Sequence, residues 1–481
     1  MAITILQKPK YKLIPASSKI IFTLTDNVVL ANKKKIKFVA EVYVSNKSGN
    51  ISNIIENRVA VLKTTPNGEG SAIFDLSPIL QSHVSPDYDG GTVHNTNTNF
   101  HSQYNGTDYS DTTPHTIHQI DDFSTNRNSV RFFKVMFNVE AAASLTGSVT
   151  QQYNTDTPSD VFLIYNGVLY DTDTIKMDVN GNFGYHLGHQ NLIMNSSGDK
   201  FFTNAPTTQY VRTADYLTLP FISQYNDDFR VGVSGITNPS IRYIKIQFYY
   251  NGSTTGSLIT KEIQASTGGH SGYMSDSNVK LQFAGVGTGN LVGSGVSLPA
   301  NWDYYTVVAH DYGDNLVSDT YYIYKQNEDC KGYETIRLTW LNKFGTWDYY
   351  NFTKKSTRTF NATRKTYSQI TGSWNKSKYI LNGHSGGSKS FNNTIKESIV
   401  LNTDFITEAQ SEWLEELFIS NDVYILKQRS TDNTNEGYIR KYLEPVTLTS
   451  NSYTRKTQAN DRLIQHTLNI QTTRTKKSQR V

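Results

Sequence analysis

Alternation of apolar and polar residues with a period of two is the feature that most constrains the fold of this chain. Successive side chains of a β-strand point to opposite faces, so this period predicts strands with one buried face. The clearest runs are 37–45, 128–140, 242–250, 303–311 and 319–325. We therefore expect a mainly β (all-β) protein.

The composition favours the same fold class. Aromatic residues make up 12% of the 481 residues, with 31 Tyr and 22 Phe, whereas charged residues make up only 18%. Tyr, Phe, Thr and Val favour strands, and Asn, Gly and Ser favour turns. A helical enzyme would contain more Ala, Leu and Glu. A chain of this length has room for about two to four domains.

Three domains are expected from the placement of strands and turns. Residues 1–145 are expected to form an N-terminal β-sandwich with a long insert at 87–127 that has almost no apolar periodicity. Residues 146–325 are expected to form a middle β domain, and residues 326–481 a C-terminal β domain with a basic tail. The expected domains are immunoglobulin- or fibronectin-like sandwiches.

One convincing amphipathic helix is predicted at 407–420, in the C-terminal domain. Thr407 and Gln410 fit a capping box, in which the two side chains satisfy free backbone amides at the start of a helix. Trp413 and Leu417 share an apolar face, and Glu residues lie elsewhere on the helix surface.

Glycines mark the predicted turns. The pairs Asn166-Gly167 and Asn251-Gly252 each separate two apolar runs, which predicts two tight hairpins. The glycine-rich run 285–295 is followed by no Lys-Ser/Thr and lies in no βαβ unit. It is predicted to be a flexible loop rather than a phosphate-binding loop.

The stretch 334–352 holds six aromatic residues within 19 positions. It could be a binding platform, part of a core, or a patch for a neighbouring subunit. Its apolar residues alternate on both sides of a turn at Asn342–Gly345. We expect a core hairpin whose second face meets the helix that carries Trp413, or a neighbour.

Charge is strongly segregated along the chain, although the net charge is only +4. Residues 1–40 and 349–396 are basic, while 64–126 and 404–422 are acidic. Such blocks are either ordinary solvated surface or complementary interfaces. The candidate interface residues are Lys33, Lys34, Lys35, Asp87, Asp89, Lys354, Lys355, Arg358, Arg364, Lys365, Glu412, Glu415, Glu416, Lys476 and Lys477.

The basic stretch 349–396 contains nine Lys or Arg, no acid, and interleaved aromatics. This composition is typical of surfaces that bind single-stranded nucleic acid. The aromatics alternate as in a strand, so most are expected to face a core, and an acidic protein would satisfy the same charges. Nucleic acid ranks third among the candidate partners, and we do not expect it to be bound.

No motif of the sequence indicates catalysis. Cys330 is the only cysteine, which excludes an intrachain disulfide and a cysteine-based zinc site. Eleven histidines form no known metal-site spacing, so loop surface is the default, with a metal or pH-sensitive contact in the acidic block as the alternative. Carboxylates form no recognisable acid–base pair. We expect no enzyme, no metal and no cofactor.

The N-terminus lacks a signal-like apolar run, and no segment approaches the roughly 18 apolar residues of a membrane-spanning helix. We therefore expect a chain made in a cytosol and no membrane span.

Several phrases, taken in sequence order, resemble virion structural proteins of tailed bacteriophages, especially those that infect Bacteroidetes and related marine bacteria. The phrases are KFVAEVYVS, TTPNGEGSAIFDLSPILQSHVS, KFFTNAPTTQYVRTADYLTLPF, ETIRLTWLNKFGTWDYYNF, FITEAQSEWLEELFISNDVYIL and YTRKTQANDRLIQHTLNIQ. They leave the insert at 87–127 and the glycine-rich 265–297 region unmatched. The resemblance implies chains of β-sandwich domains in the tail, baseplate or neck, and it brings no catalytic residues.

The expected function is a structural subunit of a phage virion. The chain would be made in the cytoplasm of the bacterial host and assemble into an oligomeric ring through charge-complementary β-domain interfaces. Its expected partners are further copies of itself and other virion proteins. The alternative is a tail protein that binds a receptor or a carbohydrate, such as a glycan of the host surface. That alternative predicts a cluster of exposed aromatic residues.

Overall fold

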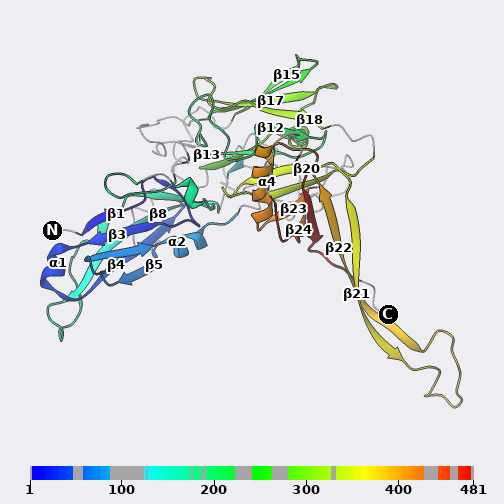
Figure 1. Cartoon of the computed structure of the whole chain (residues 1–481), viewed down its shortest axis with the longest axis horizontal. Coiled ribbons are helices and arrows are strands. Elements are labelled where there is room, and N and C mark those ends of the chain that lie inside the picture. Colours follow the sequence, from blue (N-terminus) through cyan, green and yellow to red (C-terminus); the bar gives the residue numbers. More distant parts are fainter. Residues whose placement is uncertain are drawn as a thin grey trace. The chain divides into compact units, whose positions relative to one another are not determined.

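The fold is known from a computed structural model (Figure 1). The structure describes residues 3–46, 58–86, 117, 124–125, 128–174, 177–185, 187, 191–222, 241–262, 280–326, 332–426, 443–454 and 464–477. The chain divides into two compact units. Unit 1 comprises Met1–Gln326 and Leu341–Asp348, and unit 2 comprises Asn327–Trp340 and Tyr349–Val481.

Two sheets share one core in the first part of unit 1. The smaller sheet has the order β1-β3-β6, and the larger has the order β2-β11-β8-β4-β5, with β9 and β10 also paired to β8. The strands are β1 Thr4–Gln7, β2 Leu13–Pro15, β3 Ile21–Thr25, β4 Lys34–Ser45, β5 Arg58–Thr64, β6 Ser71–Asp75, β8 Val130–Ala142, β9 Thr150–Gln151, β10 Thr157–Pro158 and β11 Phe162–Tyr165.

Aromatic side chains from both sheets fill this core. Phe22 of β3 lies 5.5 Å from Phe137 of β8 and 5.8 Å from Phe162 of β11, measured between ring centroids. All three rings are at least 98% buried. Burial of each large apolar side chain contributes on the order of 2–3 kcal/mol relative to exposure, so this cluster is a main source of stability in unit 1.

Unit 1 also contains a five-stranded and a three-stranded sheet. Their orders are β12-β18-β17-β14-β15 and β13-β16-β7. The strands are β7 Ser124–Thr125, β12 Thr208–Val211, β13 Thr218–Ile222, β14 Tyr243–Tyr250, β15 Ser253–Glu262, β16 Leu281–Gly285, β17 Tyr304–His310 and β18 Tyr321–Lys325. The five runs that alternate most clearly in the sequence form β4, β8, β14, β17 and β18, which confirms a mainly β protein.

Strands from beyond residue 145 complete the first pair of sheets, because β9, β10 and β11 all pair with β8. The sheet of the N-terminal region thus extends to Tyr165. The three-domain division expected from the sequence stays a prediction.

The two Asn-Gly signals had different outcomes. Asn251 and Gly252 have φ angles of 48° and 77° and join β14 to β15, so this hairpin is confirmed. The hairpin at Asn166-Gly167 is wrong. β11 pairs with β2 and β8 instead, and the amide of Val168 donates to the carbonyl of Lys343 at 2.8 Å. Long-range pairing has overridden the local turn signal.

The glycine-rich run is also not a loop throughout, because it contains helix α3, Thr288–Gly293. Long-range hydrogen bonds hold this helix: the Thr288 hydroxyl donates to the Arg212 carbonyl at 2.7 Å, and Asn290 Oδ1 accepts from the Leu217 amide at 2.8 Å. A Cβ at Gly289 would lie only 2.8 Å from the Ala214 carbonyl oxygen. The glycines here permit close packing.

The remaining helices of unit 1 are short. They are α1 Asn27–Asn32, α2 Ser77–Leu80, and the 3₁₀ helices Gln81–His83 and Asp171–Asp173. Asp26 begins α1 by accepting hydrogen bonds from the amides of Val28 and Val29. No helix in the described part of the chain is long and apolar enough to cross a membrane.

Unit 2 is built on one large sheet of the order β20-β19-β23-β24-β25-β22-β21, with β26 also paired to β22. Its strands are β19 Ile336–Leu341, β20 Trp347–Phe352, β21 Thr357–Gln369, β22 Gly387–Asn402, β23 Val423–Leu426, β24 Leu443–Leu448, β25 Thr467–Thr472 and β26 Lys476–Lys477. The predicted helix is confirmed as α4, Glu408–Ile419, with the expected capping box between Thr407 and Gln410.

Candidate functional site

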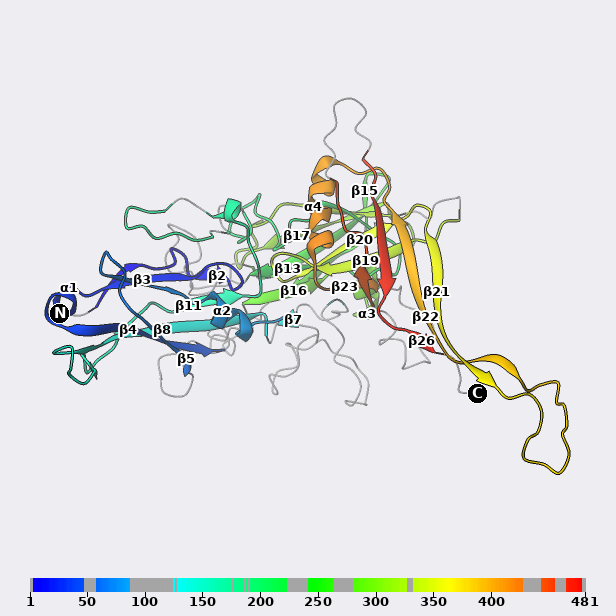
Figure 2. The same ribbon diagram turned by 60° about the horizontal axis from the view of Figure 1, so that its bottom comes forward.

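The longest exposed element of unit 2 is the ribbon of β21 and β22 with the loop between them, residues 357–402, called the arm below. The two strands pair in antiparallel register from Thr357 opposite Val400 to Gln369 opposite Gly387. In Figures 1 and 2 the arm extends beyond the other strands of the unit 2 sheet. Twelve of the thirteen β21 residues are exposed, so the ribbon carries almost no core of its own.

Support for the arm decreases along its length. Near its base, β22 also pairs with β25, and further along with β26, where Lys476 lies opposite Ile395 and Lys477 opposite Thr394. Among the described strands, β21 and β22 alone continue beyond Thr394. An isolated two-stranded ribbon is at best marginally stable in water. β21 is an edge strand of its sheet, and such an edge presents unpaired backbone groups.

The end of the arm, residues 370–386, holds a small aromatic cluster. The rings of Trp374 and Tyr379 are 5.8 Å apart, and Trp374 Nε1 donates to the Thr371 carbonyl at 3.0 Å. Trp374 is nevertheless 77% exposed. The other exposed large apolar residues of the arm are Phe360, Tyr367, Ile370, Tyr379, Ile380, Leu381 and Phe391. So many exposed apolar side chains on one element indicate an interaction surface.

These exposures correct the expectation that the aromatics of 349–396 mostly face a core. Phe352 is buried, but Phe360, Trp374 and Phe391 are exposed. Alternation only places successive side chains on opposite faces of the ribbon. The pattern does not require that either face be covered.

The cations of the arm are neutralised at its base and not towards its end. Arg358 binds both carboxylate oxygens of Glu334, at 3.1 and 2.7 Å, and Glu397 at 2.5 Å. Burial lowers the pKa of Arg358, but these two carboxylates outweigh it and raise the pKa, so the group stays charged. Just before the arm, Lys354 pairs with Asp404 at 3.0 Å.

Further out along the arm, the described residues form no such pairs. Arg364, Lys365, Lys376 and Lys378 are exposed, and among the described residues none of them lies within 4.0 Å of a carboxylate oxygen. Exposed cations that cluster without anions repel one another, so an acidic surface would be attracted to this part of the arm.

Helix α4 carries the acidic candidates Glu412, Glu415 and Glu416. Its opposite face packs on the sheet, where Trp413 lies 5.0 Å from Trp340 and 6.2 Å from Tyr350, between ring centroids. Five of the six aromatics of 334–352 are buried and Tyr350 is half-buried. The core hairpin and its contact with the Trp413 helix are therefore confirmed.

The other candidate interface residues are scattered. Lys33 ends α1, and Lys34 and Lys35 begin β4, where Lys35 Nζ donates to the Gly147 carbonyl at 3.2 Å. Lys355 is exposed at the base of the arm, and its carbonyl accepts from Asn402 at 2.7 Å. Asp87 and Asp89 lie outside the described residues. Within the described part of the chain, the candidates gather at three places: Lys33, Lys34 and Lys35 at the start of β4, the arm with β26, and α4.

A row of tyrosines on unit 1 was missed from the sequence. Tyr210, Tyr324, Tyr304 and Tyr249 lie side by side on the four strands β12, β18, β17 and β14. Neighbouring ring centroids are 6.0, 5.2 and 4.9 Å apart in that order. Partial loss of solvent, and then the neighbouring tyrosines, raise the pKa of Tyr304.

The signal for this row was present in the strand pattern. Tyr occupies the polar phase of the alternation in β14, β17 and β18, so rings stand on the outer face as well as on the inner one. Tyr249 and Tyr304 are stacked with an interplanar angle of 7°. Stacked rings present their edges and hydroxyl groups, rather than their faces, to a ligand.

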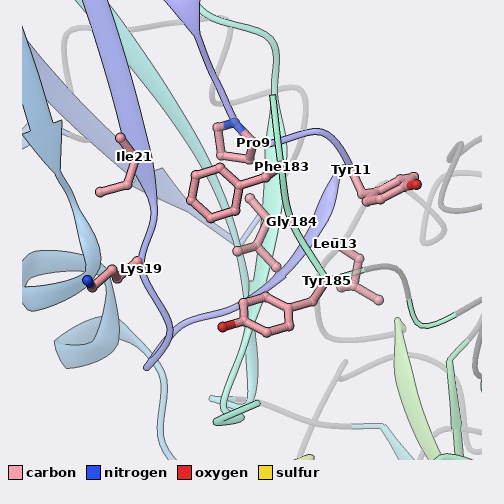
Figure 3. A pocket seen from close by; sticks show the side chains of 9 residues that line it. Pro9, Tyr11, Leu13, Lys19, Ile21, Phe183, Gly184 and Tyr185 are labelled. Atoms are coloured by element: carbon pink, nitrogen blue, oxygen red, sulfur yellow. The ribbon is translucent and has the colours of Figure 1, made fainter. Parts of the chain in front are cut away.

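A small cavity of unit 1 lies beside β2 and β3 (Figure 3). Pro9 and Phe183 lie together on its wall, and Tyr185 and Lys19 also line it. Its solvent space is about 10 Å³, which is the room for about one water molecule. Pockets for cofactors usually enclose ~300–1,000 Å³. Within the described residues, no three His, Cys, Asp or Glu side chains are grouped as metal ligands.

Comparisons with known proteins show no family. No family model matches the chain, and no curated protein matches it. Among solved structures, E. coli alpha-2-macroglobulin matches with 9% identity over 83% of this chain, and Salmonella alpha-2-macroglobulin with 8% over 97%, each with a TM-score of 0.19. This chain spans 21% and 23% of those two chains. Matches this distant carry no argument about fold or function.

Proposed function

We propose that this chain is a structural subunit of a phage virion that assembles through its arm into an oligomeric ring of the tail, baseplate or neck. The proposed domains are immunoglobulin- or fibronectin-like sandwiches, and the proposed place of synthesis is the cytoplasm of the bacterial host. The proposal includes no catalytic role and no cofactor. It rests on the resemblance of the sequence phrases and on the exposed arm.

The arm is the single observation that carries the proposal. It exposes apolar rings, unpaired strand edges and unneutralised cations together, and each of these is costly for an isolated soluble protein. A partner that covers the arm would bury the rings and neutralise the charges. An assembly subunit has such a partner in every mature particle, where the rings, strand edges and cations of the arm would be covered.

Shortening the arm tests this proposal. Replacing residues 366–391 by Asn-Gly would join Lys365 directly to Asn392, which already lie opposite each other, through a two-residue hairpin turn. Sedimentation velocity at low and high salt should show discrete oligomers for the full chain and a monomer for the shortened one. Equal circular dichroism spectra would show that both fold. Equal assembly by both chains would refute the role of the arm.

The tyrosine row favours a second candidate, a tail protein that binds a glycan of the host surface. The row is uncharged, with Tyr210 and Tyr324 exposed and Tyr249 and Tyr304 half-buried, and its hydroxyl groups suit a ligand rich in hydroxyls. Glycan-array binding that survives shortening of the arm and is lost on Tyr304→Ala/Tyr324→Ala would support it. No binding by the full chain would count against it.

A further inference from the structure

We infer that the outer face of the five-stranded sheet of unit 1 binds a neutral glycan chain that lies across the strands. This inference rests on the second candidate of the proposed function, because it names the class of glycan and the direction in which the chain lies. All the residues that carry it belong to unit 1.

The tyrosine row runs across the sheet towards both of its edges. It begins at Tyr210 on the edge strand β12 and passes over β18 and β17 to Tyr249 on β14. On the other edge strand, β15, the exposed Thr254 lies opposite Tyr249 and adds a further hydroxyl group. Neighbouring strands are about 4.8 Å apart, so the row is on the order of 20 Å long. A polymer that lies along it can continue past both edges, so the row suits the interior of a chain rather than its end.

A second row of uncharged side chains runs beside the tyrosines. It lies two residues further along each strand and therefore on the same face of the sheet. The ring of Tyr322 lies 6.1 Å from that of Tyr304, between centroids, and joins the two rows. We call the two rows together the strip, and none of its positions carries a charged side chain. The members of the second row lie opposite one another in the order Thr208, Tyr322, Thr306 and Gln247.

Hydroxyl groups of the strip are available to a ligand. Those without a hydrogen bond to any described residue belong to Tyr249, Tyr304, Tyr322, Tyr324 and Thr306. A phenol keeps its proton at neutral pH because its ordinary pKa is about 10, so each of these groups can both donate and accept. The hydroxyl groups of a glycan have the same two functions, and the strip can therefore be paired with one along its whole length.

Two cations beside the strip are already engaged. Lys245 is the next residue on this face of β14, and its ammonium group is paired with Asp314 at 2.7 Å. The ammonium group of Lys325, in β18, lies over the ring of the buried Trp302, at 5.2 Å from its centroid. An acidic polymer would have to compete with both contacts.

A carboxylate near the strip also disfavours an acidic ligand. Asp303 is exposed and precedes Tyr304 in the chain. Partial loss of solvent and the neighbouring tyrosines raise the pKa of Tyr304, and the charge of Asp303 raises it further. That charge would repel the carboxylate or phosphate groups of an acidic glycan or a nucleic acid. The electrostatics of this face therefore suit a neutral glycan.

A second copy of the chain is the competing occupant of this face. A face-to-face contact would bury the hydroxyl groups, and each would then need a partner on the facing sheet. Protein interfaces usually have an apolar, fully buried centre. The centre of the strip instead carries the hydroxyl groups of Tyr304, Thr306 and Tyr322. The observations favour a glycan, whose own hydroxyl groups supply the partners.

Removal of the hydroxyl groups alone tests the inference. The row variant is Tyr249→Phe/Tyr304→Phe/Tyr324→Phe, which keeps the rings. The matched control is Tyr250→Phe/Tyr312→Phe/Tyr333→Phe, at exposed positions outside the strip. Native electrophoresis of the full-length protein through gels that contain a soluble glucan, mannan or galactan should retard the wild type and the control. The apparent dissociation constant of the row variant should be at least tenfold higher, and the corresponding monosaccharides should not compete.

Each other outcome overturns the inference in a distinguishable way. Equal retardation of the row variant and the wild type would leave glycan binding standing, at another site. Retardation by alginate or hyaluronate alone would contradict the neutral class, and full competition by a monosaccharide would contradict recognition along a chain. No retardation by any of these polymers would also overturn the second candidate, while assembly through the arm is tested separately by sedimentation velocity. Loss of a dimer in the row variant and not in the control would assign the face to a second copy.

Discussion

The hairpin β19–β20 and the arm follow each other directly in the chain, and both are antiparallel pairs rich in aromatic residues, yet their environments are opposite. Trp340 and Trp347 of the first hairpin are at most 1% exposed, whereas Trp374 of the arm is 77% exposed. Strand alternation therefore identifies which residues share a face, but whether that face is covered depends on the rest of the fold. Helix α4 covers the first hairpin, and no described element covers the arm.

The sequence distinguishes the two elements by their content of charged residues. The first hairpin contains one cation in β19, Arg337, which is buried and binds Asn351 at 2.9 Å. The arm contains cations along both strands, including Arg364 and Lys365 next to each other, which no core could bury without partners. Aromatics interleaved with unpaired cations indicate an interface more than a core.

The largest expected effect is a difference in stability between variants of the buried Trp340 and the exposed Trp374. Trp340→Ala should lower the free energy of unfolding by about 3–5 kcal/mol, because it removes a fully buried ring that packs on Trp413. Trp374→Ala should change it by only about 0.5 kcal/mol or less, because the ring is already mostly in water. Urea unfolding of both variants measures the contrast. Similar losses would mean that the arm end is packed like the core hairpin.

The second prediction concerns self-association, to which the exposed Trp374 should contribute strongly although it contributes little to stability. Trp374→Ala should weaken self-association by ~2 kcal/mol, or roughly 30-fold, since exposed Trp residues at the centre of an interface carry much of the binding energy. Tyr333→Ala, at an exposed position of unit 2 outside the arm, is the matched control and should leave association unchanged. Sedimentation equilibrium gives both constants. Unchanged association of the Trp374 variant would place the interface elsewhere.

A third prediction concerns the shape of the arm end. Gly372 has a φ of +76°, and a Cβ there would lie 2.5 Å from the Tyr379 ring. Gly372→Ala should therefore displace Tyr379, at a cost of ~1–2 kcal/mol to the local structure, and weaken association. Gly383→Ala, where a Cβ meets nothing within 4 Å, is the control. Hydrogen exchange of the 370–386 amides should rise in the first variant only, and equal exchange would contradict the proposed local packing.

The same two regions show how far sequence reasoning reached. The alternating strands, helix α4 with its cap, and the buried hairpin of 334–352 could be predicted because local pattern and tertiary environment agree there. The Asn166-Gly167 hairpin, helix α3 and the exposure of the arm could not. Segments distant in sequence decided the first two cases, because β11 pairs with β2 and helix α3 is hydrogen-bonded to Leu217. In the third case, no described element covers β21. The tyrosine row was missed because Tyr suits both faces of a sheet.

The smallest expected effect is a pH dependence confined to the covered sheet of unit 2. Tyr424 of β23 lies opposite Thr339 of β19. Burial, and then the charge of Asp422 and a hydrogen bond to it at 3.2 Å, raise the pKa of Tyr424. A phenol with a higher pKa in the folded state contributes stability that is complete below its unfolded pKa of ~10 and is lost as the pH rises through the folded pKa. Tyr424→Phe should therefore show a shallower loss of stability between pH 9 and 11 than the wild type, in paired urea titrations. Parallel curves for the two proteins would show that this half-buried phenol contributes nothing to the pH dependence of stability.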